Sequence, residues 1–213
     1  MFPLRKEIED AFQAAAYLSV EVDLSKIDHE EVKKAVSDLG VYKDGTKLQD
    51  HVSTEAYSKI TAFLKENEMP ENSFDIFKPW LVQQQIMSIQ SAKAGFKPES
   101  GIDQYLIDKA NEAKKPIIAL ERSDAQFQLN NSYSDGLQER LLLQNLDPNS
   151  VIPPAPDVST DYLTKIWKEG DYNALTESLK SFDRDLAMAE KMKNYLNSDH
   201  KETHLVVVGF GLF

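Results

Sequence analysis

The apolar residues of this chain recur at two spacings, which predict helices that alternate with short strands. Pro3–Ala16 shows helical spacing, whereas apolar and polar residues alternate in Tyr17–Leu24. Short apolar runs at Pro116–Glu121 and Leu205–Val208 predict two further strands. The order of helix, strand and helix is typical of α/β proteins. We therefore predict an α/β fold, with α+β as the alternative, in which helices form layers around a small central sheet.

Polar caps, prolines and glycines mark where the helices begin and end. Asp28 is placed to cap a helix that has Gly40 as its C′ residue. Ser123 and Gln126 are placed to cap one long helix that runs toward Leu146. The first helix has a predicted apolar side of Leu4, Ile8, Ala11, Phe12 and Ala15. The other predicted helices are Thr54–Asn67, Pro79–Gly95, Tyr105–Ala113 and Phe182–Leu196.

The length of 213 residues suits a single domain. Prolines cluster in residues 147–159, and such a cluster predicts a loop. We therefore predict one domain over residues 1–213, and the proline-rich loop is where a subdomain break would fall.

The charge balance excludes several classes of partner. The chain has 35 acidic and 24 basic side chains, a formal net charge of -11. Such a surface repels phosphate backbones and anionic lipids, so we predict no nucleic-acid partner and no attraction to membrane surfaces. Cysteine is absent, which excludes disulfides and thiolate zinc sites. No stretch approaches the roughly 20 apolar residues of a membrane helix, so we expect a chain that is soluble as it stands.

Two glutamates stand where predicted strands bring them to the edge of a sheet. Glu21 shares a predicted strand face with Asp23, and Glu121 follows the next strand and precedes a helix. Open α/β sheets bind ligands at the carboxyl ends of their strands. Simpler interpretations stay open: Glu21 as a surface carboxylate paired with a base, Glu121 as a favourable charge at a helix N-terminus, and Arg184 as a surface ion pair. The four histidines show no metal-binding spacing.

Four stretches occur in a fixed order over nearly the whole chain: Phe2–Asp23, Gly101–Leu106, Lys115–Glu121 and Arg184–Gly209. Together they resemble the TraB/GumN family, which includes pheromone-shutdown proteins and is similar to the Tiki metalloproteases. The resemblance implies a metal-dependent peptidase with a divalent metal as cofactor and a peptide as substrate. It leaves the compartment open, because members of the family are often exported or membrane-anchored.

The resemblance also implies roles for three residues. In the family, the chemistry needs two Gly-x-x-His motifs together with acidic residues and an arginine. The matching positions are Glu21 as general base or metal ligand, Glu121 as a second carboxylate ligand, and Arg184 as the group that stabilises charge on the reacting carbonyl.

Both histidines of the family pattern are missing from this sequence. The first motif is expected on a strand before residue 1, and Leu212 stands at the second histidine position. Asp185 replaces the family's usual asparagine. Two carboxylates without imidazoles hold a transition metal poorly, because catalytic metals usually keep about three protein ligands. We therefore expect a divalent metal to be weakly held or absent, and the domain to be inactive in this form.

Two alternatives remain from the sequence. The domain could bind a peptide or small molecule without turnover, as a pheromone-sequestering protein would. It could also be a fragment whose exposed sheet edges drive the formation of a homo-oligomer.

Overall fold

The computed structural model of the protein describes residues 3–95, 101–146, 183–197 and 202–208, without the side chains of residues 183–186. The chain divides into two compact units. The first, here called the sheet unit, is drawn from Met1–Ile27, Pro98–Ser123 and Pro153–Leu212. The second, here called the helical unit, is drawn from Asp28–Lys97 and Asp124–Ile152. The predicted loop at 147–159 lies outside the described residues, so the predicted subdomain break there stays a prediction.

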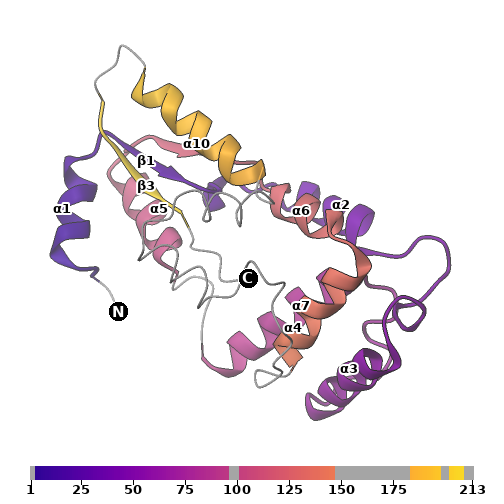
Figure 1. The fold of residues 1–213 in the computed structure, drawn as a ribbon. Coiled ribbons are helices and arrows are strands. Elements are labelled where there is room, and N and C mark those ends of the chain that lie inside the picture. Colours follow the sequence, from indigo (N-terminus) through magenta and orange to yellow (C-terminus); the bar gives the residue numbers. More distant parts are fainter. Residues whose placement is uncertain (1–2, 96–100, 147–182, 198–201, 209–213) are drawn as a thin grey trace, which may run out of the picture. The chain divides into compact units, whose positions relative to one another are not determined.

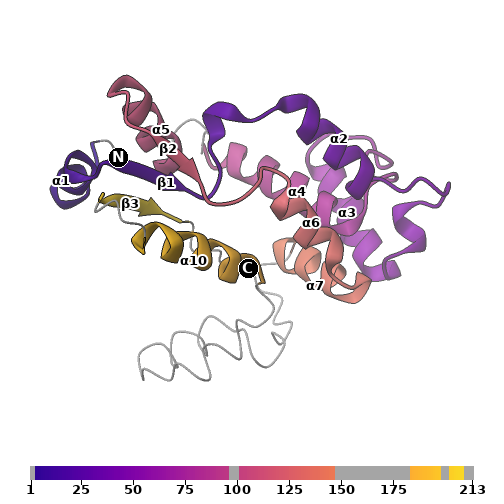
Figure 2. The same ribbon diagram turned by 90° about the horizontal axis from the view of Figure 1, so that it is seen from above.

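The sheet unit has an α/β fold, which confirms the predicted class. Its described strands form a parallel sheet in the order β2-β1-β3, so that β1 is central (Figures 1 and 2). In this sheet Leu18 of β1 lies opposite Ile117 of β2 and Leu205 of β3. The elements are α1 (Lys6–Ala14), β1 (Tyr17–Val20), η1 (Leu24–Lys26), α5 (Ile102–Glu112), β2 (Ile117–Ala119), α10 (Asp183–Leu196) and β3 (His204–Val207).

Helices cover both faces of β1. Figures 1 and 2 show α5 and α10 on opposite sides of the strands. On one face, Leu18 and Val20 are buried in a cluster with Phe12 of α1 and Leu106 of α5. On the other face, Ser19 is 1% exposed and its Oγ lies 3.1 Å from His204 Nδ1.

Three aromatic rings close this second face at the amino ends of the strands. The His204 ring stacks on Tyr17 of β1, with 4.9 Å between centroids, and on Tyr195 of α10, with 5.2 Å. The face of β1 that carries Tyr17 and Ser19 is therefore covered by α10.

The predicted strand Tyr17–Leu24 is also too long. Strand β1 ends at Val20, and the chain turns into η1, where Leu24 is 41% exposed. Asp23 causes the turn, since its side chain accepts a hydrogen bond from the Ser25 backbone N–H as an N-cap. Consequently, Glu21 and Asp23 do not share a strand face.

The helical unit has its own core and confirms most of the predicted helices. Buried residues from several helices meet there, namely Leu48, Ile60, Leu64, Phe74, Val82, Ile86 and Leu142. Throughout the described residues, no helix is both long and apolar enough to cross a membrane. The elements are α2 (His29–Gly40), η2 (Leu48–Asp50), α3 (Thr54–Glu66), α4 (Pro79–Lys93), α6 (Ala125–Ser132) and α7 (Asp135–Leu146).

The single long helix predicted toward Leu146 is two helices, α6 and α7. Tyr133 has extended backbone angles, and Asp124, not Ser123, occupies the N-cap of α6. The buried Gln138 side chain donates to the Tyr133 carbonyl at 2.8 Å and accepts from the Trp80 backbone N–H at 3.3 Å. The first bond satisfies a carbonyl at the break and so stabilises the interruption of the helix, and the second satisfies a backbone N–H in the first turn of α4.

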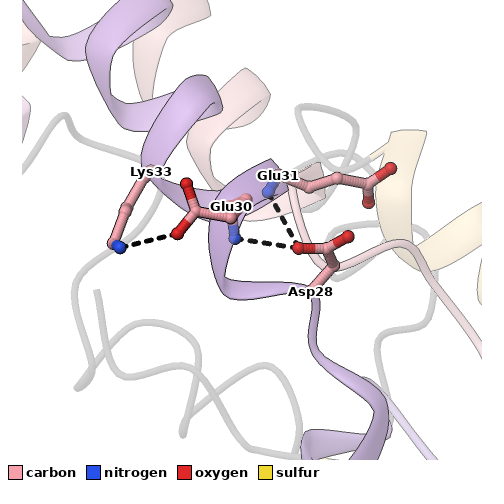
Figure 3. A network of polar contacts seen from close by, with 4 residues as sticks. All are labelled: Asp28, Glu30, Glu31 and Lys33. Atoms are coloured by element: carbon pink, nitrogen blue, oxygen red, sulfur yellow. Dashed lines mark hydrogen bonds and ion pairs between the residues drawn. The ribbon is translucent and has the colours of Figure 1, made fainter.

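The two ends predicted for α2 differ in outcome. Asp28 caps the helix as predicted, since its Oδ1 accepts from the backbone N–H groups of Glu30 and Glu31 at 2.8 and 3.2 Å (Figure 3). Gly40, in contrast, is the last helical residue and its φ is not positive, so it is not a left-handed C′ residue. A Cβ atom there would lie 2.7 Å from Leu81 Cδ2, so this position is glycine because two helices approach closely.

Candidate functional site

The two predicted glutamates lie on neighbouring main chains at the carboxyl ends of β1 and β2. The backbone N–H of Leu120 donates to the Val20 carbonyl at 2.8 Å, and that of Glu121 donates to the Glu21 carbonyl at 2.9 Å. Pairing thus continues one step beyond each strand. We call this region the carboxyl edge.

A hollow of about 200 Å³ opens at the carboxyl edge within the sheet unit. Its lining includes the half-buried Glu121 but not Glu21. The structure therefore brings the backbones of the two glutamates together without placing both side chains in this hollow. The lining residues are Val22, Asp23, Lys26, Ile27, Ile117, Ala119, Glu121 and Ser123.

Asp23 is a buried carboxylate in this lining, with one oxygen hydrogen-bonded and the other in an ion pair. Its side chain is 6% exposed, and its Oδ1 accepts from the Ser25 N–H at 3.1 Å and from the Ser25 hydroxyl at 2.6 Å. Lys26 Nζ lies 2.8 Å from Oδ2. Burial raises the pKa of Asp23, but the bonds from Lys26 and Ser25 outweigh it and hold the pKa below its ordinary 3.8.

This lowered pKa predicts an acid-dependent contribution of Asp23 to stability. A carboxyl group with a lower pKa in the folded chain stabilises the fold above its ordinary 3.8, and the effect disappears as the pH falls through the folded pKa. We expect the loss of unfolding free energy caused by Asp23→Asn to be largest near neutral pH. The loss should shrink as the pH falls below 3.8. Urea unfolding at a series of pH values measures it.

Asp10→Asn is the matched control, because the Asp10 side chain is 63% exposed and surface ion pairs contribute little. A loss of stability in Asp23→Asn that stays constant from neutral to acid pH would contradict the expectation.

Lys191 is a basic residue at the carboxyl edge that the sequence patterns did not single out. Its Nζ donates to the carbonyls of Ala119 and Leu120 at 2.8 and 3.3 Å, and so joins α10 to the end of β2. Arg184 precedes it by two helical turns, so the two positions lie on one face of α10. The Arg184 side chain itself lies outside the described residues. In the sequence, the helical spacing from Arg184 was the only signal that could have pointed to Lys191 as a residue of this edge.

Near the carboxyl edge, Asp103 is a second acid whose pKa is shifted from its ordinary value. It lies in the first turn of α5, where Gly101 occupies the N-cap and no side-chain cap bond is present. Burial raises the pKa of its carboxyl group above the ordinary 3.8. Helix α5 leads into β2 and packs against η1, so this turn lies toward the carboxyl edge.

The described residues alone do not fit a metal centre. Among them, no group of three or more His, Asp or Glu side chains is arranged to hold an ion. His204 is stacked between tyrosines at the opposite end of the strands, and His51 stacks on Tyr42 in the helical unit. Leu212 lies outside the described residues. Within the described ranges, the acidic residues at the carboxyl edge thus have no third ligand of the kind that protein-bound catalytic metals usually have.

Comparison with known proteins gives one family. A model of the TraB/PrgY/gumN family matches residues 1–213. Among curated proteins, Uncharacterized protein YbaP of Escherichia coli (strain K12) is 24% identical over 127 residues, which are 60% of this chain and 45% of that protein. YbaP of Shigella flexneri matches with the same figures. The chain therefore covers less than half the length of these relatives. No solved structure matches.

Proposed function

Because this chain belongs to the TraB/PrgY/gumN family, we propose that it is a peptidase-like domain whose acidic site residues are Glu21 and Glu121. The hydrogen bond from the Glu121 N–H to the Glu21 carbonyl, at 2.9 Å, is the observation that carries the proposal. It holds both residues at the carboxyl ends of adjacent parallel strands, where α/β proteins bind ligands. Glu21 serves as general base or metal ligand, and Glu121 as the second carboxylate.

The direction of α10 supports a role for Arg184 at the same edge. Tyr195 stacks on His204 at the start of β3, whereas Lys191 bonds to Ala119 at the end of β2. The helix therefore runs from the carboxyl ends of the strands toward their amino ends. Its first turn, which contains Arg184, lies beyond Lys191 on the side of the carboxyl edge. From there the arginine would stabilise negative charge on a reacting carbonyl.

The site is incomplete for turnover in this chain. Carboxylates alone suit hard ions such as Mg²⁺ and Mn²⁺, and they hold transition metals weakly. Leu212, at the family's second histidine position, has no ligand atom. The proposed activity of the complete family site is metal-dependent peptide hydrolysis. For this chain we expect no hydrolysis of peptides in the presence of Mn²⁺ or Zn²⁺.

Restoring the histidine tests the proposal. We expect Leu212→His to tighten Zn²⁺ binding, measured by calorimetry, by at least about tenfold, since even outer-shell partners of metal ligands change affinity by about 10–100-fold. Adding Glu121→Gln should remove the gain. Glu112→Gln, at an exposed position of α5, is the matched control and should keep it. An absent gain, or a gain that survives Glu121→Gln, would reject the assignment of Glu121 as a ligand.

The hollow favours a second function, binding without turnover. It combines apolar walls with charged side chains, as ligand sites do. In this alternative the domain sequesters a peptide or a small molecule. Because Glu21 does not line the hollow, binding there should survive Glu21→Ala, whereas hydrolysis by a completed site would not.

A further inference from the structure

The hollow at the carboxyl edge combines charged residues of both signs with an apolar wall in a small volume. We propose that it binds a small zwitterion, an α-amino acid with an apolar side chain. This inference names a ligand class for the binding function proposed above and therefore rests on it.

The size of the hollow limits the ligand. Its volume of about 200 Å³ is below the 300–1,000 Å³ or so of sites that enclose drug-sized molecules. The apolar part of the lining is Val22, Ile27, Ile117 and Ala119. An aliphatic side chain fits this wall, because burying apolar surface is favourable by about 25 cal/mol per Å².

The cationic end of the hollow is Lys26. Its ammonium carries three N–H donors and lies 2.8 Å from Asp23 Oδ2, while the side chain is 72% exposed. Asp23 holds the ammonium in place from a buried position, and Ser25 in turn donates two hydrogen bonds to Asp23. Lys26 is thus positioned by its partner and still has donors for a ligand carboxylate.

The anionic end is formed by Glu121, and Ser123 is also part of the lining. A carboxylate offers about four lone-pair sites, so Glu121 can accept from a ligand ammonium in addition to its contacts within the protein. Asp23 is less suited to this role, because both of its oxygens already face donors.

Charge selects a zwitterion over simple ions. An anion that approaches Lys26 meets the carboxylates of Asp23 and Glu121 and a chain of net charge -11. A cation that approaches Glu121 meets the ammonium of Lys26. A molecule with an ammonium and a carboxylate on one carbon is neutral overall and pairs with both ends.

Ligand analogues test the proposal on the unmodified chain. The ¹⁵N-labelled protein is titrated in EDTA with L-leucine, with leucinamide, which lacks the carboxylate, and with 4-methylpentanoate, which lacks the ammonium. We expect saturable chemical-shift changes of the Ala119, Glu121 and Ser123 amides with leucine. The dissociation constants of both analogues should be at least about tenfold higher, because each analogue loses one charge-assisted hydrogen bond. No saturable shift, or equal binding of all three, would overturn the proposal.

Variants assign the two ends. Lys26→Met should weaken the binding of leucine about tenfold and leave the affinity for leucinamide unchanged. Lys33→Met is the control, because Lys33 is also 72% exposed and pairs with Glu30 at the same spacing (Figure 3). An effect of Lys33→Met equal to that of Lys26→Met would reject the site. If Lys26→Met fails to fold, the analogue series decides alone. EDTA keeps this test separate from the metal experiment, so either proposal can fail without the other.

Discussion

Replacing Phe12 with alanine is expected to lower the unfolding free energy of the sheet unit by about 3–5 kcal/mol. The ring is 1% exposed and packs with Leu18, Val20 and Leu106, so its removal leaves a cavity where α1, β1 and α5 meet. It also removes a partner of Lys109 and Lys115, whose ammonium groups lie 5.2 and 4.8 Å from the ring centroid. Urea unfolding measures the loss.

Ile8→Ala is the matched control for Phe12→Ala. Ile8 lies on the same helix and on the same predicted apolar side, one turn earlier, but it is 38% exposed. A side chain that keeps contact with water loses less on truncation, so we expect a cost of about 1 kcal/mol or less. Equal losses for the two variants would show that α1 does not pack on the sheet through Phe12.

Ile86→Ala is expected to cost about 2–5 kcal/mol in the helical unit. Ile86 is 0% exposed and packs in the core with Val82 of the same helix and with Leu142 of α7. Met87→Ala is the matched control, since Met87 is the next residue of α4 and is 45% exposed. A cost for Met87→Ala as large as that for Ile86→Ala would contradict the orientation of α4.

Hydrogen exchange adds a prediction about where the two variants act. The buried cores of the sheet unit and the helical unit share no residue in the part of the chain that the structure describes. Cooperative units open separately when few contacts join them. We expect Phe12→Ala to reduce amide protection in α1, β1 and α5, and Ile86→Ala to reduce it in α3, α4 and α7. Loss of protection at the same amides in both variants would instead indicate one cooperative unit.

The candidate site was predictable from the sequence only in part. Glu121 was predicted at a strand end and Glu21 on the face of a strand, because strand periodicity and chain direction are local signals, but the strand that carries Glu21 ends one residue before it. The family resemblance then gave them roles, which stay predictions. Lys26 and Lys191 were missed, since an ion pair with Asp23 and bonds to the carbonyls that end β2 follow from positions in space. The separation of Glu21 from the hollow was missed for the same reason.

For the fold, the sequence by itself determined the class, the presence and order of the strands, and most helix ends. Pro79 begins α4, and Gly95 follows it with a φ of 81°, because proline and glycine restrict or free the backbone locally. The tertiary structure decided which surfaces are covered. Ser19 is buried by contact with His204, 185 residues away, and Lys191 closes the end of a strand 72 residues earlier. Local periodicity shows that a segment has two faces, but only packing with distant elements decides whether both are buried.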